Sequence, residues 1–401
     1  MLGYVYKFKI KNVFLLVLVV SGALYFVQFL FLSEVRHPVI VWWTPFMGDH
    51  ERMITCSKYT CLLSKDRTHV NNKNLQAFLF YGSLFKYEDT PIPKSRIWAV
   101  FHEESPRNVA LFLYQRTYDV FDITATFSRY SDFPLTLQYL ENLTMITDNR
   151  YLVSLYEKNR LLDSIAPVLY VQSDCDTPVE RDAYIAELMK HIQVDSFGAC
   201  LNNKHFPKGI ADVNSMDLYN DKLLHFIAKY KFVLAFENAI CDDYITEKLW
   251  RPLVVGSVPV YLGSPSVEDW LPNPSSAILA KNFATPEELA NYIHKINAND
   301  TLYETFLEHK SGKVENNFLK STLRKGRFGV DSDQDDLIPA FECFVCQQIH
   351  EGVTKRGSKS VYDCIEPKEG NSWEYFWQSG DCQSRALVDS VVNNKSERVS
   401  C

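Results

Sequence analysis

Five polar side chains lie in one short stretch of the sequence, residues 230–263, in a pattern that could hold a phosphate-bearing ligand. These side chains belong to Glu237, Asn238, Tyr244, Glu247 and Lys248. A lysine ammonium near a helix start can bind phosphate oxygens, and free backbone N–H groups and the helix dipole add to that attraction. A carboxylate beside the lysine could hold a pair of ribose hydroxyls. The pattern therefore predicts a nucleotide site, whereas an isolated Glu-Lys pair is more often a solvated helix face.

The same stretch contains the elements that would position these side chains. Residues 232–236 form a continuous apolar run of strand length, apolar residues then recur at helical spacing, and residues 258–262 form the next strand. Such a β-α-β unit presents its ligand at the carboxyl ends of the strands. Pro252 lies inside the expected helix and should bend it, because proline removes one backbone hydrogen bond.

Strand-like runs alternate with helical patterns along the chain, which indicates an α/β fold with parallel sheets. The expected strands cover residues 39–43, 76–81, 97–101, 118–123, 168–171, 232–236, 258–262 and 277–280. The expected helices cover residues 181–191, 217–230 and 286–298. Residues 324–336 are rich in charge and glycine and are expected to form an exposed connection.

Several motifs in series resemble the alpha-1,3-fucosyltransferases, glycosyltransferase family 10. The donor-side segment reads FENAICDDYITEKLW and continues to VPVYLGSPSV. Upstream, residues 39–48 read VIVWWTPFMG, residues 98–108 read WAVFHEESPRN, and residues 125–134 read ATFSRYSDFP. The resemblance covers roughly residues 38 to 300.

The resemblance implies a GT-B fold, in which two Rossmann-like domains face a cleft. We therefore expect an N-terminal acceptor domain at residues 33–165 and a C-terminal GDP-fucose-binding domain at residues 166–330. A cytoplasmic tail at residues 1–12 and a transmembrane anchor at 13–32 would precede them, and a cysteine-rich segment at 331–401 would follow.

The family reaction is an inverting transfer of L-fucose from GDP-β-L-fucose to a hydroxyl group, in α linkage. The resemblance implies that Glu104 accepts the proton of that hydroxyl. Glu103 is adjacent, and successive side chains on a strand point to opposite faces, so only one of the two can serve. Without the resemblance, Glu104 would read as a helix-start or surface carboxylate.

On the donor side, the resemblance implies a role for each of the five polar residues of the β-α-β unit. Lys248 is expected at the diphosphate and Glu247 at the ribose, while Asn238 and Tyr244 would bind phosphate oxygens. Glu237 is expected to orient the loop or the sugar.

The family has a further cation at the phosphates, for which this chain offers Arg181 and Lys204. Two acidic residues, Asp242 and Asp243, depart from a phosphate-binding pattern, so their carboxylates must point away or bind something else. No D-x-D motif stands in a plausible donor loop. We therefore expect a reaction that needs no metal and no cofactor besides the donor substrate GDP-fucose.

Residues 13–32, VFLLVLVVSGALYFVQFLFL, carry no charge and are long enough to span a membrane as a helix. Lys7, Lys9 and Lys11 precede them, so the positive-inside rule predicts a single-pass type II protein with its catalytic part in the lumen of the Golgi or endoplasmic reticulum. A cleaved signal peptide is the competing interpretation, although the apolar run is long and no clear cleavage site follows.

Three sequons agree with a luminal placement and begin at Asn142, Asn299 and Asn394. Ten cysteines also suit an oxidising lumen, so disulfides are expected, with Cys343, Cys346, Cys364 and Cys382 as candidates in the tail. These four lack the second close pair of a zinc ribbon, which disfavours a metal site.

The net charge of −7 gives no basic field for nucleic acid. The acceptor stays open between N-acetylglucosamine of a glycan and a Ser or Thr of a folded luminal protein domain. A non-catalytic glycan-binding or scaffolding protein of the same fold is the alternative, but binding alone would not require Glu104 together with Glu247 and Lys248.

Overall fold

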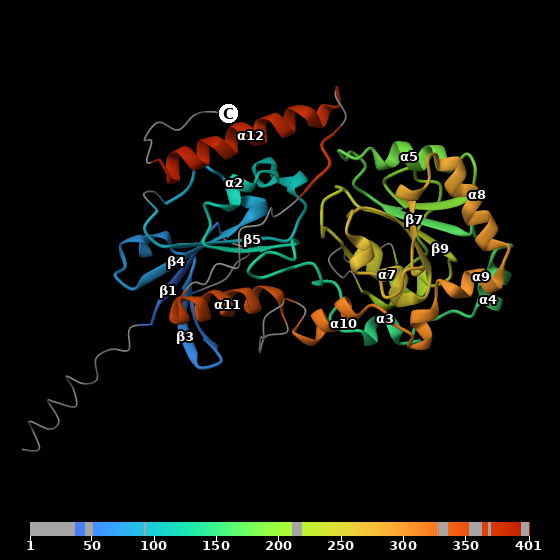
Figure 1. Cartoon of the computed structure of the whole chain (residues 1–401), viewed down its shortest axis with the longest axis horizontal. Coiled ribbons are helices and arrows are strands. Elements are labelled where there is room, and N and C mark those ends of the chain that lie inside the picture. Colours follow the sequence, from blue (N-terminus) through green and yellow to red (C-terminus); the bar gives the residue numbers. More distant parts are fainter. Residues whose placement is uncertain are drawn as a thin grey trace, which may run out of the picture.

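The computed structural model describes residues 37–44, 51–91, 94–210, 219–326, 328, 336–352, 363–367, 370–393 and 401. Within them the chain forms two separate sheets that lie side by side, each accompanied by helices (Figure 1). The expected α/β fold with parallel sheets is confirmed.

The N-terminal sheet has six strands in the order β2-β3-β1-β4-β5-β6. Their bounds are β1 Val39–Thr44, β2 Arg52–Cys56, β3 Tyr59–Ser64, β4 Leu75–Tyr81, β5 Ile97–His102 and β6 Ile123–Thr126. All pairs are parallel except the antiparallel β2–β3 hairpin, which was not among the strands expected from the sequence. The strand expected at residues 118–123 is wrong, because Gln115–Tyr118 forms helix α2 and β6 begins only at Ile123.

The C-terminal sheet is fully parallel, with five strands in the order β11-β10-β9-β7-β8. Their bounds are β7 Val168–Gln172, β8 Val194–Gly198, β9 Phe232–Phe236, β10 Val258–Leu262 and β11 Ile278–Leu279. Both faces of β9 are buried, as its continuous apolar run predicts.

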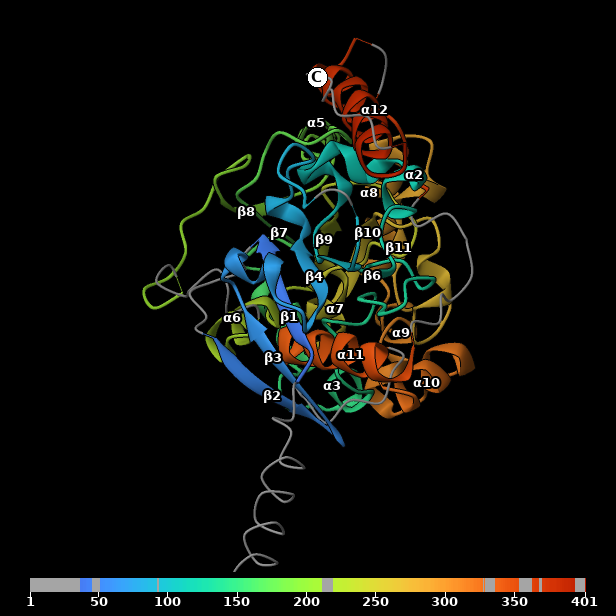
Figure 2. The ribbon, with the colours of Figure 1, turned by 90° about the vertical axis from the view of Figure 1, so that its left-hand side faces the viewer.

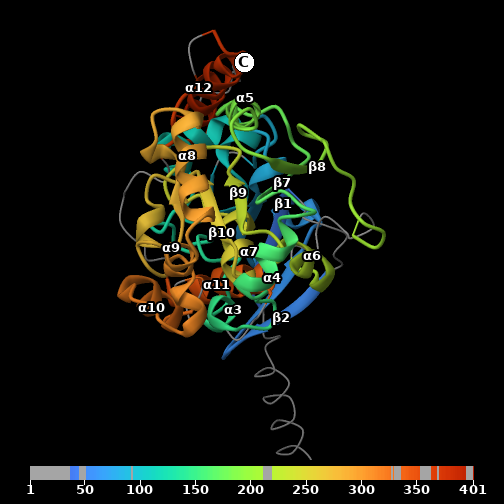
Figure 3. The ribbon, with the colours of Figure 1, turned by 90° about the vertical axis from the view of Figure 1, so that its right-hand side faces the viewer.

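Helices surround the C-terminal sheet (Figure 3). Their bounds are α3 Thr144–Thr147, α4 Leu155–Leu161, α5 Arg181–Leu188, α6 Asp221–Ile227, α7 Glu247–Val255, α8 Pro286–Asn297, α9 Asp300–Thr305 and α10 Asn317–Arg324. Helix α7 connects β9 to β10, contains Pro252, and ends at Gly256, whose φ of 74° suits glycine.

The C-terminal part of the chain returns to the N-terminal sheet as two helices, α11 (Leu337–Glu351) and α12 (Ser372–Val391). Helix α11 packs against β2 and β3, and α12 lies on the opposite face of that sheet, over α2 (Figure 2). The side chain of Glu342 in α11 accepts a hydrogen bond from the Trp42 indole of β1 at 2.8 Å and pairs with Arg52 at 2.6 Å.

All ten cysteines are paired. The disulfides are Cys56–Cys343, Cys61–Cys346, Cys175–Cys200, Cys241–Cys364 and Cys382–Cys401. Each of the four tail candidates pairs with a cysteine outside that group, so the expectation of disulfides is met. The first two bonds fasten α11 to the β2–β3 hairpin.

The expected transmembrane anchor at 13–32 and the sequon at Asn394 lie outside the described residues. Among the residues that are described, no helix has the length and apolar character needed to cross a membrane.

Candidate active site

The start of helix α7 is built around the carboxylate of Glu237, which follows the last residue of β9. Thr246 is the N-cap of α7, and its backbone N–H and hydroxyl both donate to Glu237, at 2.8 Å each. Glu237 is buried, and burial raises its pKa. The carboxyl end of β9 is thus tied directly to the first turn of α7.

Lys248 and Glu247 lie in that first turn and form a compact charged cluster with Arg251. The Lys248 Nζ lies 3.1 Å from the Thr246 hydroxyl, 3.2 Å from Glu247 and 3.6 Å from the Glu237 carboxylate, so two carboxylates share its charge. Burial disfavours the Glu247 carboxylate, but Lys248 and Arg251 outweigh it and lower its pKa to about 2. The cluster therefore keeps an ammonium and an ionised carboxylate side by side at neutral pH.

Glu104 lies two residues beyond the end of β5, on the N-terminal sheet. Burial raises the pKa of Glu104, while Lys248 opposes that rise and Glu247 adds to it. Lys248 and Glu247 therefore lie within electrostatic range of Glu104. A carboxylate with a raised pKa, held beside a cation, is suited to accept a proton.

Glu103 is the first residue after β5, and its side chain has a different partner. Its Oε1 accepts a hydrogen bond of 2.5 Å from the hydroxyl of Tyr81, at the end of β4. Burial raises the pKa of Glu103 to about 7. The two adjacent carboxylates therefore have different neighbours: Tyr81 for Glu103, and Lys248 and Glu247 for Glu104.

Tyr244 and Asn238 border the same cluster. The Tyr244 ring is buried, packs edge-on against Phe127 at 4.7 Å, and has its pKa raised by burial and then by Glu104. The side-chain Oδ1 of Asn238 is buried without a hydrogen-bond partner among the described residues. A buried, unpartnered oxygen of this kind could accept a hydrogen bond from a ligand.

The two candidates for a further phosphate-binding cation lie in different places. Arg181 is fully buried and donates to the carbonyl oxygens of Phe236, at 3.1 Å, and Asp174, at 2.5 Å, so it braces the ends of β9 and β7. Lys204 lies 3.7 Å from Asp195, near the amino ends of the strands. The structure thus places Lys204 at the opposite edge of the sheet from Lys248.

Of the two acidic residues in the donor segment, Asp242 and Asp243, the second is paired with Arg129. Arg129 was not among the site residues expected from the sequence. Asp243 points away from Lys248 and accepts charged hydrogen bonds from Arg129 and one from the Trp270 indole at 3.0 Å. The signal available in the sequence was the lone arginine of ATFSRYSDFP, a segment already matched to the family.

A disulfide links the loop between β9 and α7, here called the donor loop, to the C-terminal segment. Cys241 bonds to Cys364, and the backbone of Ile365 donates to Ile240 at 2.9 Å. A short piece of the C-terminal segment is thereby paired with the loop between β9 and α7. The sequence named Cys364 as a disulfide candidate but could not supply its partner.

Two groups of residues have metal-ligand spacing within the described parts of the chain, and each contains a disulfide. They are Cys61 with Cys346 and His350, and Cys175 with Cys200 and Asp182. Their sulfurs are bonded to each other and are not thiolates, which metal ligation requires.

Two of the three sequons lie in the described residues, and their asparagines, Asn142 and Asn299, are both exposed.

Comparison with known proteins identifies the family. The model "Glycosyltransferase family 10 (fucosyltransferase) C-term" matches residues 162–365, and "Fucosyltransferase, N-terminal" matches residues 35–139. Solved structures titled "Crystal Structure of alpha1,3-Fucosyltransferase with GDP" and "with GDP-fucose" align with TM-scores of 0.47 and 0.43 and identities of 18% and 20%. The alignments cover 82% and 76% of this chain, and 94% and 93% of those chains.

Curated relatives are much more similar in sequence. "GDP-fucose protein O-fucosyltransferase 3" of Homo sapiens is 48% identical over 79% of this chain and 67% of its own length. The Xenopus tropicalis protein of that name is 47% identical over 79% and 68%, and the Gallus gallus protein is 44% identical over 89% and 76%. From these matches, the chain belongs to glycosyltransferase family 10, the fucosyltransferases.

Proposed function

We propose that this chain transfers L-fucose from GDP-β-L-fucose to a Ser or Thr hydroxyl of a folded protein domain, with inversion to an α linkage. The observation that carries the proposal is the position of Glu104 opposite Lys248 and Glu247, in a chain 48% identical to a protein named as a GDP-fucose protein O-fucosyltransferase. One side of this site can hold a nucleotide and the other can take a proton.

Glu104 acts as the general base in this reaction. Burial raises its pKa, which makes it a stronger proton acceptor than an exposed glutamate, and Lys248 opposes part of that rise. The hydroxyl that loses its proton attacks the anomeric carbon directly. Attack opposite to the leaving GDP inverts the β linkage of the donor to an α linkage.

The first turn of α7 holds the leaving group. The Lys248 ammonium and the helix N-terminus stabilise the negative charge that develops on the diphosphate. Ionised Glu247 accepts hydrogen bonds from the ribose hydroxyls, and the Tyr244 hydroxyl and the Asn238 Nδ2 donate hydrogen bonds to phosphate oxygens. Arg181 supports the loops from beneath, and Lys204 has no part in donor binding.

The reaction takes place in the lumen of the Golgi or endoplasmic reticulum, with residues 13–32 as a membrane anchor. Five disulfides support an oxidising compartment. The exposed sequons at Asn142 and Asn299 agree with it. An apolar segment preceded by lysines supports a type II orientation.

The test is an incubation of the full chain, solubilised in detergent, with labelled GDP-fucose and two sets of acceptors. One set contains folded cysteine-rich protein domains and their reduced, unfolded forms, and the other contains glycans that end in N-acetylglucosamine. We expect label on the folded domains alone, released by base as an O-linked sugar. Label on the glycans would replace the protein acceptor by a sugar, and binding of GDP-fucose without any transfer would favour the non-catalytic alternative.

A further inference from the structure

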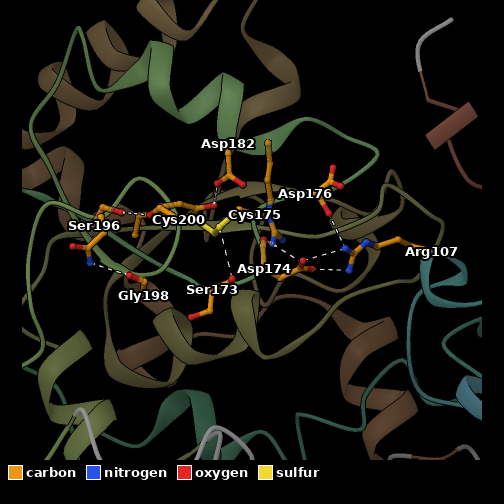
Figure 4. Close-up of a disulfide and its surroundings, with 12 residues drawn as sticks. Arg107, Ser173, Asp174, Cys175, Asp176, Asp182, Ser196, Gly198 and Cys200 are labelled. Atoms are coloured by element: carbon orange, nitrogen blue, oxygen red, sulfur yellow. Dashed lines mark hydrogen bonds and ion pairs between the residues drawn. A yellow bond between two sulfur atoms is a disulfide. The ribbon is translucent and has the colours of Figure 1, made fainter. Parts of the chain in front are cut away.

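Arg107 connects the two halves of the molecule next to the predicted base. It lies in the short 3-10 helix Pro106–Asn108, three residues after Glu104. Its guanidinium makes two hydrogen bonds to the carboxylate of Asp174, at 2.6 and 3.0 Å, and a third to the carbonyl of Asp176 at 2.7 Å (Figure 4). Both partners lie in the loop that follows β7 of the C-terminal sheet.

Trp373 of helix α12 contacts both Arg107 and the loop after β7. The guanidinium of Arg107 lies 4.9 Å from the centre of the Trp373 ring, within the range of a cation–π interaction. The Trp373 indole donates to the Asp176 carboxylate at 2.9 Å. Cys175 lies between the two aspartates and forms a disulfide with Cys200, which follows β8. The loop that Arg107 contacts is therefore covalently linked to the end of a second strand.

Asp174 continues the connection toward the donor residues. Its carbonyl accepts a hydrogen bond of 2.5 Å from Arg181, which donates through its other terminal nitrogen to Phe236. Phe236 ends β9 and precedes Glu237, whose carboxylate holds the first turn of α7. An unbroken series of charged and backbone contacts therefore runs from the segment that carries Glu104 to the helix that carries Lys248.

We propose that Arg107 is a positioning residue for fucosyl transfer, which sets the Glu104 carboxylate relative to the first turn of α7, and that Trp373 of α12 holds its guanidinium in place. This inference rests on the proposed function. A planar, bidentate guanidinium is suited to the task because it fixes both the distance and the angle between two segments. Displacing a reacting group by about 1 Å can reduce a rate by about 100-fold.

The same pair adjusts the charge around Glu104 in opposite senses. Arg107 lowers the pKa of Glu104, and Asp174 raises it. The groups that interact electrostatically with Glu104 are Lys248, Glu247, Arg107, Asp174, Glu103 and the phenols of Tyr81, Tyr139 and Tyr244. Removing either charge should therefore shift the acidic limb of the pH–rate profile in a direction that depends on which charge is removed.

The experiment compares Arg107→Gln, Arg107→Lys and Asp174→Asn with the parent full chain in detergent. At saturating GDP-fucose, we expect Arg107→Gln to reduce kcat by about 10- to 100-fold, with little change in the dissociation constant for GDP. Its acidic limb should move to higher pH, and that of Asp174→Asn to lower pH. Arg107→Lys keeps the charge but loses the fork, so its kcat should fall while its acidic limb stays in place.

Arg160→Gln is the matched control, because Arg160 of helix α4 also pairs with a carboxylate, that of Glu157 at 3.0 Å, and this pair is exposed. It should match the parent in every measurement. The proposal is overturned if Arg107→Gln is as active as Arg160→Gln. It is also overturned if Arg107→Gln and Asp174→Asn shift the acidic limb in the same direction. A fall in kcat that merely parallels a lower melting temperature in all three variants would also overturn it. If the parent transfers no fucose, the proposed function fails, and this inference fails with it.

Discussion

Arg129 and Asp243 join the two sheets beside the donor loop. The Arg129 guanidinium, from the loop after β6, contacts the buried Asp243 carboxylate at 2.6 and 2.9 Å, and its face lies 4.7 Å from the centre of the Trp270 ring. Asp243 has a φ of 59°, a left-handed conformation that turns it toward this partner. One negative charge that would have opposed a diphosphate is thus neutralised within the protein.

Asp243→Ala should destabilise the protein strongly, because it leaves the half-buried Arg129 without its main partner. Breaking a buried ion pair from one side typically costs about 3–5 kcal/mol. Urea unfolding measures the difference. Glu187→Ala is the control, because it breaks the exposed pair with Lys190 and should change the free energy of unfolding by less than about 1 kcal/mol. Equal unfolding midpoints for the two variants would contradict the assigned role of Asp243.

Lys248→Ala should weaken GDP binding about 10- to 150-fold, since a charge-assisted hydrogen bond contributes about 1.5 to 3 kcal/mol. The variant also leaves the Glu237 and Glu247 carboxylates without their ammonium, which adds to the loss. Titration calorimetry with GDP measures it. Lys204→Ala, at the opposite edge of the sheet, should bind GDP as the parent does. If Lys204→Ala binds GDP more weakly than Lys248→Ala does, GDP binds near the amino ends of the strands and the proposed donor site is wrong.

The β9-α7-β10 unit was predictable from the sequence because its signals are local. An apolar run of strand length, helical spacing and a second apolar run identify the three elements, and the carboxyl ends of parallel strands then place the polar residues. Strand β6 was not placed correctly, because Tyr118, Val120 and Phe121 are apolar without being in a strand. Only the pairing of Ile123 with Ala99 shows where β6 begins.

The contacts that complete the site depend on residues far apart in the sequence, and no local pattern reports them. Trp373 meets Asp176 across 197 positions, and Cys343 meets Cys56 across 287. The sequence marked the cysteines as disulfide candidates, but pairing requires the fold. For the same reason, Arg181 and Lys204 could not be told apart before the sheet edges were known.

Glu104→Gln should keep donor binding and lose transfer by roughly 100- to 10,000-fold, the usual range for removing a general base. The amide keeps the shape of the side chain but cannot accept the proton. Because only the ionised carboxylate is active and burial raises its pKa, the acidic limb of kcat/KM in the parent should lie above the ordinary value of 4.5. Glu103→Gln is the matched control, and a larger loss of transfer for it than for Glu104→Gln would exchange the two roles.

Glu103 should make the stability of the protein depend on pH. Its pKa rises from 4.5 in the unfolded chain to about 7 in the fold, so its contribution to stability is full below pH 4.5 and is lost as the pH rises through 7. The loss is on the order of 3 kcal/mol. Glu103→Gln should remove this part of the pH dependence in unfolding experiments between pH 4.5 and 7. If the free energy of unfolding changes with pH equally in the parent and in Glu103→Gln, the pKa of Glu103 is not raised by folding.

Removing the Cys241–Cys364 disulfide should weaken donor binding, because this bond fixes the loop between β9 and α7. In the double variant Cys241→Ser with Cys364→Ser, the loop that carries Asn238 and Tyr244 has to be ordered when the donor binds, and that ordering costs affinity. We expect the dissociation constant for GDP-fucose to rise about 10-fold, which corresponds to about 1.4 kcal/mol. Removing Cys382–Cys401 in the same way leaves the donor loop tethered and should leave the affinity unchanged. If both double variants bind GDP-fucose equally well, the tether does not organise the site.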